Sequence, residues 1–121
     1  MGDIDEQTIA SSATISSPQS YDGVINNYGQ TADVTLTLLA CLKGMNFVIR
    51  LSTTVNKFFY IDPAASEVIT LDGVALTGGF RVGVTSAAVN QEIHFNAVQT
   101  GAATWAWDAK MVLGPWINVG S

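Results

Sequence analysis

The segment from Phe58 to Gly73, with the sequence FFYIDPAASEVITLDG, decides the fold class of this chain. Its apolar runs FFYI and VITL are separated by Asp62-Pro63, and the second run is followed by Asp72-Gly73. Proline fixes its own φ and pushes the preceding residue towards extended geometry, so the first run should end as a strand at Asp62. Asp-Gly supplies the positive φ angles of a tight hairpin turn. The segment therefore predicts two strands and two turns in a compact β-sheet protein.

The rest of the chain repeats this pattern. Residues 33–38 alternate strictly between polar and apolar, residues 92–99 alternate again, and 104–112 form a further strand-like run. A period of two is typical of a half-buried strand. No segment of ten residues or more has the apolar period of a helix, and Gly, Asn, Asp and Pro turns separate the runs. These features predict an all-β fold, a β-sandwich or jelly-roll-like domain of about eight short antiparallel strands.

The chain divides into two parts by composition. Residues 1–20 are acidic and rich in serine, whereas the strand pattern fills residues 21–121. We predict an extended N-terminal arm over 1–20 and a single β-sandwich domain over 21–121. An arm of this kind is either disordered or lies along a neighbouring subunit, where it becomes ordered on binding.

The composition is unusually poor in charge. Hydrophobic residues make up 48% of the chain and charged residues only 12%, whereas about 25% charged residues is typical of soluble domains. Either small polar side chains cover the surface, or much of it is buried against another chain. The net charge of −5 and the scattered five basic residues disfavour binding to nucleic acid or to an anionic membrane.

The N-terminus and the apolar runs bear on where the protein folds. Residues 1–6 are acidic where a signal peptide would be basic, and no run approaches the ~20 apolar residues of a membrane span. These features predict a soluble chain that folds in the cytoplasm of the cell that makes it.

Cys41 and His94 are the only residues of their types. A single cysteine excludes an intrachain disulfide, and its apolar neighbours indicate a buried, inert thiol. A zinc site would have to be completed by carboxylates, and a catalytic triad would have to use this one histidine. We expect His94 to be a solvated or interface residue, and we predict no catalytic residue, no metal site and no cofactor.

Three carboxylates, Asp62, Glu67 and Asp72, flank the two central turns. Clustered oxygens could bind calcium, and paired carboxylates could catalyse glycoside hydrolysis. Asp-Pro and Asp-Gly are also common turn residues whose side chains bond nearby backbone N–H groups. We favour the turn interpretation.

Four aromatic residues are candidate glycan or subunit contacts: Trp105, Trp107, Trp116 and Tyr28. Trp105 and Trp107 are two residues apart, so on a strand they point to the same face. Exposed rings would form a stacking platform for a sugar, whereas buried rings would fill the core or a subunit interface. We favour burial, because a small β domain needs large apolar residues in its core.

The segments 25–38 (INNYGQTADVTLTL), 58–63 (FFYIDP) and 69–73 (ITLDG) resemble parts of small β-rich structural proteins of tailed bacteriophages. The likeness spans most of residues 21–119 and consists of turn and strand motifs. It implies a virion protein, either a capsid decoration (cementing) protein or a head-fibre or tail-fibre protein. It also implies a homo-oligomer, commonly a trimer, that contacts the major capsid or tail protein. Such proteins have no catalytic residues to transfer.

The sequence thus favours a non-enzymatic virion structural protein on a capsid or tail surface. The alternative is a carbohydrate-binding module that uses surface tryptophan or tyrosine side chains. Exposure of the aromatic rings would distinguish the two.

Overall fold

The computed structural model describes residues 6–121, and it is all-β, as predicted. Within this range no helix is long and apolar enough to cross a membrane. The elements in chain order are β1 (Glu6–Thr8), β2 (Ala13–Thr14), η1 (Pro18–Ser20, a 3-10 helix), β3 (Tyr21–Asn26), β4 (Val34–Thr37), β5 (Asn46–Arg50), β6 (Phe59–Asp62), β7 (Ile69–Leu71), β8 (Val74–Ala75), β9 (Arg81–Val84), β10 (Glu92–Gln99), β11 (Trp105–Leu113) and β12 (Ile117–Gly120).

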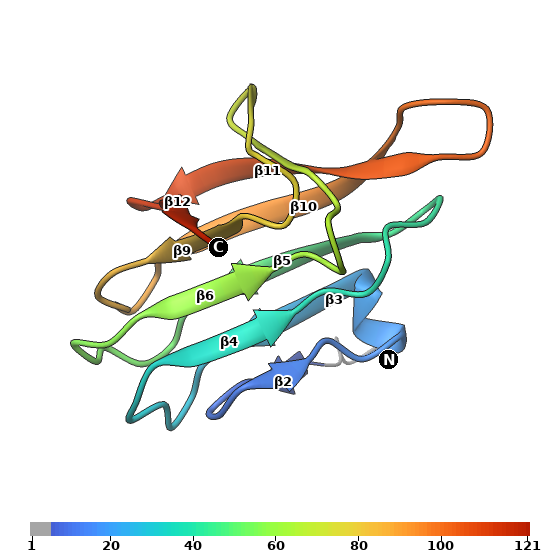
Figure 1. Ribbon diagram of the computed structural model, residues 1–121. Coiled ribbons are helices and arrows are strands. Elements are labelled where there is room, and N and C mark those ends of the chain that lie inside the picture. Colours follow the sequence, from blue (N-terminus) through green and yellow to red (C-terminus); the bar gives the residue numbers. More distant parts are fainter. Residues whose placement is uncertain (1–5) are drawn as a thin grey trace.

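The strands form two mixed sheets. The larger sheet has the strand order β1-β3-β5-β10-β11-β7-β8, and the smaller has the order β12-β9-β6-β4-β2. In Figure 1 the smaller sheet runs from β2 at the bottom to β12 at the top, with β3, β5, β10 and β11 behind it. The prediction of about eight antiparallel strands was wrong. Residues 6–121 form twelve strands, and half of the strand pairings are parallel.

The parallel pairing has a simple origin in the path of the chain. Strands β1 to β6 alternate between the two sheets, odd strands in the larger and even strands in the smaller. Each passage through a sheet therefore lies beside the previous one and runs in the same direction, giving the parallel ladders β1-β3-β5 and β2-β4-β6. The antiparallel pairings come later in the chain, in the β7–β8 hairpin and where β9 to β12 join the two sheets.

The alternating pattern of residues 33–38 places its apolar side chains inside, as predicted. Val34, Leu36 and Leu38 are buried, whereas the threonines between them are half-buried. The first strand of the central segment ends at Asp62, immediately before Pro63, which confirms the prediction made from the proline.

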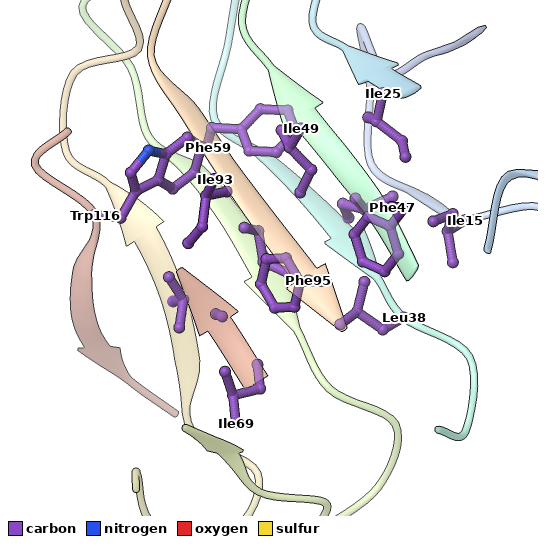
Figure 2. Close-up of a cluster of buried hydrophobic side chains, with 14 of the residues drawn as sticks. Ile15, Ile25, Leu38, Phe47, Ile49, Phe59, Ile69, Ile93, Phe95 and Trp116 are labelled. Carbon is purple, nitrogen blue, oxygen red and sulfur yellow. The ribbon is translucent and has the colours of Figure 1, made fainter. Parts of the chain in front are cut away.

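One hydrophobic cluster lies between the sheets. Figure 2 shows Ile25, Ile49 and Ile93, neighbours on β3, β5 and β10, beside the rings of Phe47 and Phe95. The Phe47 and Phe95 rings stack with their centroids 5.0 Å apart, and Trp107 meets both rings edge-on. Full burial of such side chains stabilises the fold by about 1.5–3 kcal/mol each.

Residues 6–20 are joined to this core. β1 pairs with β3 and β2 pairs with β4, so the segment supplies one edge strand to each sheet. Ile9 and Ile15 are buried in the hydrophobic cluster. The predicted arm also included residues 1–5, which lie outside the described residues.

A buried pair of polar side chains ties the β3–β4 loop to the segment after β5. Asn27 is fully buried, and its Oδ1 accepts hydrogen bonds from the backbone N–H groups of Ser52 and Thr53 at 2.8 and 2.9 Å. Its Nδ2 donates to the Thr53 carbonyl at 3.1 Å and to Oε1 of Gln30 at 2.8 Å. All four hydrogen-bonding positions of the amide are therefore filled.

Candidate functional site

An apolar groove lies where the β7–β8 hairpin approaches the start of β12. We call it the edge groove. Its volume is about 410 Å³, and its apolar lining comes from Leu71, Val74, Ala75, Leu76, Met111, Trp116 and Ile117. Asp72, Thr77 and Asn118 complete the lining.

The Asp72-Gly73 turn builds one wall of the edge groove. Both residues have positive φ, 47° and 87°, as a tight hairpin turn requires. The turn pairs Leu71 with Val74 across the hairpin, as predicted for this dipeptide. The Asp72 carboxylate then accepts a hydrogen bond from the backbone N–H of Met111 at 3.0 Å, which fixes the hairpin to β11.

Trp116 forms the floor of the edge groove. Its side chain is buried, its ring meets that of Phe59 edge-on, and its indole N–H donates to the Leu113 carbonyl at 2.9 Å. The hydrogen bond holds the ring across the turn that contains Pro115. The floor is therefore a buried ring with its N–H satisfied, whereas Val74 and Ile117 in the lining are exposed aliphatic groups.

Both sheets end at this side of the molecule. β8 pairs only with β7, and β12 pairs only with β9, in the part of the chain that is described. An open strand edge presents unpaired backbone N–H and C=O groups, to which another strand can pair. Val74 is 67% exposed and Ile117 is 41% exposed. The edge groove thus combines open backbone edges with apolar side chains.

The predicted aromatic contacts lie in different places. Trp107 and Trp116 are buried, and Trp105 is half-buried against the core on the same face of β11 as Trp107. Tyr28 is 72% exposed, on the turn after β3. Burial therefore removes two of the three indole rings from the surface. The buried N–H of Trp107 has no hydrogen-bond partner in the described residues.

His94 lies in a row with Arg50 and Glu92 on the outer face of the larger sheet. Oε1 of Glu92 accepts from Nε of Arg50 at 2.8 Å, and its Oε2 lies 2.6 Å from Nε2 of His94. The hydrogen bond from Arg50, and to a lesser extent the one from His94, lowers the pKa of Glu92 below its ordinary value. Arg50 and His94 are both well exposed, so this is a solvated row, and its Arg50–Glu92 ion pair bridges β5 and β10.

The Glu92 carboxylate should make stability depend on acid pH. Because its pKa is lower in the folded chain, its contribution is complete above the ordinary value of 4.5 and is lost as pH falls below it. We expect Glu92→Gln to be less stable than wild type at neutral pH and to lose less stability from about pH 5 to pH 3. Urea unfolding across this range measures the slope. Asp108→Asn, on the same outer face, is the control, and equal slopes for wild type and Glu92→Gln would contradict the role of the row.

Cys41 is buried between the sheets, as predicted. Burial, with a smaller effect of the Glu67 carboxylate, raises the pKa of its thiol from 9.0 to about 12. That carboxylate also accepts a hydrogen bond from the Cys41 backbone N–H at 3.1 Å. The thiolate is the reactive form of cysteine, so the folded environment suppresses its chemistry.

The folded protein should therefore resist thiol reagents. We expect no reaction of native Cys41 with Ellman's reagent at about pH 8, and rapid reaction in denaturing urea. The contribution of the protonated thiol to stability is complete below pH 9.0 and is lost as pH rises towards about 12. Equal labelling rates for the native and unfolded chains would show that Cys41 is accessible.

The three carboxylates of the central segment do not converge. Asp62 ends β6, Glu67 reaches the Cys41 backbone, and Asp72 reaches the Met111 backbone. Glu67 and Asp72 accept from backbone N–H groups that are distant in the sequence, and not from the nearby turn N–H groups that the turn interpretation expected. Across residues 6–121, no three His, Cys, Asp or Glu side chains gather as metal ligands.

In comparisons with known proteins, no family model, no curated protein and no solved structure matches the chain.

The sequence did not indicate the edge groove. Its residues come from β7, β8, β11 and the start of β12, which are far apart along the chain. The one local signal was Asp72-Gly73, which correctly predicted the hairpin that carries Val74 to the surface.

Proposed function

We propose that this chain is a non-enzymatic structural protein that assembles as a homo-oligomer in the virion of a tailed bacteriophage. Within the virion, it would be a capsid decoration (cementing) protein or a head-fibre or tail-fibre protein. The observation that carries the assembly part is the edge groove, where both sheets end in open strands beside exposed aliphatic side chains.

A second copy of the chain is the occupant that fits the edge groove best. Asp72 is the only ionisable residue of its lining, so two copies meet without repulsion between several like charges. β12 has the sequence INVG, with none of the charged side chains that usually protect an open strand edge. The scarcity of charge over the whole chain, 12%, supports burial of surface in an oligomer.

The virion part of the proposal rests on the resemblance of segments 25–38, 58–63 and 69–73 to phage structural proteins. The same resemblance suggests a trimer and contact with the major capsid or tail protein. We further propose that the two sheets form a β-sandwich, and the jelly-roll likeness stays a prediction. Immunogold labelling of particles from the source of the chain would place it on head or tail, and unlabelled particles would contradict the virion assignment.

Light scattering after size exclusion, at several concentrations, tests assembly through the edge groove. We expect a closed oligomer for wild type and a shift to monomer for Val74→Asp and Ile117→Asp, because each places a charge against an apolar surface. Both side chains are exposed, so the variants should fold.

Val98→Asp is the matched control. Val98 is 47% exposed on β10, outside the groove lining, and the same substitution there should leave the mass unchanged. A monomeric wild type at all concentrations would contradict assembly, and groove variants with the wild-type mass would contradict this interface.

A further inference from the structure

A second cavity lies at the opposite end of the larger sheet from the edge groove. Its volume is about 530 Å³, and its lining includes Tyr28, Asn26, Arg50, Ser52 and Asn90. We call it the Tyr28 pocket. Small-molecule sites typically have volumes of about 300–1,000 Å³, so the pocket is large enough for a small ligand.

The Tyr28 ring is exposed, but its backbone is held firmly. The N–H of Tyr28 donates to Oδ1 of Asn26 at 3.0 Å, and the N–H of Gly29 donates to Oγ1 of Thr53 at 3.2 Å. The neighbouring buried amide of Asn27 anchors the same turn to the segment after β5. An exposed aromatic ring on a fixed turn loses little conformational freedom when a ligand stacks on it.

Polar groups with unused hydrogen-bonding capacity line the same pocket. Arg50 donates to Glu92 through Nε, so its terminal nitrogens remain available as donors among the described residues. Ser52 supplies a hydroxyl, which can donate and accept, and Asn90 supplies an amide, which can do both as well. Asn90 has a φ of 74° and lies on the turn that precedes β10.

The charges of the pocket are balanced. Arg50 pairs with Glu92, and Glu6, which also lines the pocket, acts on the Arg50 guanidinium through its charge. The pocket therefore has no excess of positive charge that would select phosphate, sulfate or a carboxylated sugar. A neutral ligand with several hydroxyl groups and one apolar face matches its chemistry.

We infer that the Tyr28 pocket binds a neutral pyranose, as a free sugar or at the end of a glycan. The C–H face of the sugar stacks on the Tyr28 ring, and its hydroxyl groups bond to Arg50, Ser52 and Asn90. The pocket and the edge groove lie at opposite edges of the larger sheet. Sugar binding would thus be compatible with assembly through the edge groove, and sugar binding does not depend on that assembly.

Titration of the nitrogen-15-labelled full chain with methyl glucoside, methyl galactoside, methyl mannoside and N-acetylglucosamine tests this inference by NMR. With at least one of these sugars, we expect concentration-dependent shifts of the Tyr28, Gly29 and Asn90 amides. Tyr28→Ala should weaken that binding by at least about tenfold, because it removes the aromatic contact. Tyr28→Phe keeps the ring and should bind within about twofold.

Tyr21→Ala is the matched control. Tyr21 is 45% exposed on β3 and does not line the pocket, so its removal should leave binding unchanged. No shift with any of the four sugars, or equal binding by Tyr28→Ala, would overturn the inference. Tighter binding of sialic acid than of every neutral sugar would overturn the assignment to neutral ligands.

Discussion

Replacement of Asn27 by Ala is expected to lower the free energy of unfolding by about 3–4 kcal/mol. The substitution removes an amide that is fully buried and makes four hydrogen bonds. Each buried polar group left without a partner costs about 1–3 kcal/mol. The backbone N–H groups of Ser52 and Thr53 and the Gln30 side chain would lose their partner. Ser52 is exposed, so water can restore part of this loss.

Urea unfolding followed by tryptophan fluorescence measures the effect. Asn96→Ala is the matched control, because Asn96 is exposed on β10, and we expect a change within about 0.5 kcal/mol. Asn27→Asp should also be strongly destabilising, since a carboxylate cannot donate to the Thr53 carbonyl and its charge would be buried. A loss below about 1 kcal/mol for Asn27→Ala would show that the network contributes little.

Phe95→Ala is expected to cost about 4 kcal/mol of unfolding free energy. Phe95 is fully buried, stacks on Phe47, and meets Trp107 edge-on with their ring centroids 6.1 Å apart. Removal of a buried phenylalanine typically costs about 3–5 kcal/mol, which combines lost transfer free energy with the cavity left behind. The larger sheet would lose the aromatic contact that Phe95 on β10 makes with Phe47 on β5 and Trp107 on β11.

Phe58→Ala separates burial from stacking. The rings of Phe58 and Tyr60 stack at 5.0 Å, the same centroid distance as Phe47 and Phe95, but Phe58 is only half-buried. We expect Phe58→Ala to cost about 1 kcal/mol. Equal costs for the two substitutions in urea unfolding would show that ring stacking, and not burial, determines the stability of the core.

The strands could be predicted because their signals are local. The alternation in residues 33–38 places Val34 and Leu36 on the buried face, whichever strand this segment pairs with. Pro63 ends the preceding strand because its ring restricts the backbone of the residue before it. Strand pairing depends on the path of the chain between elements, and no local signal specifies that path. Short turns suggested antiparallel neighbours, whereas β3 to β6 alternate between the sheets and pair in parallel.

The two candidate sites were only partly visible in the sequence. Asn27 and Tyr28 belong to a segment, NNYG, whose composition indicates a turn. The structure buries Asn27 and exposes Tyr28, and the difference comes from the segment after β5, which supplies the Ser52 and Thr53 backbone groups. Likewise, the burial of Trp116 depends on Phe59, a distant residue in the chain.

Hydrogen–deuterium exchange at two protein concentrations tests the central claim, assembly through the edge groove, most directly. The backbone amides of Ile117–Gly120 in β12 are compared with those of Ala13–Thr14 in β2, at the other edge of the same sheet. We predict that β12 is protected at high concentration and exchanges faster on dilution, while exchange in β2 stays the same. The two concentrations are chosen so that light scattering shows the oligomer to dissociate between them. If the exchange rate in β12 is then the same at both concentrations, this interface is contradicted.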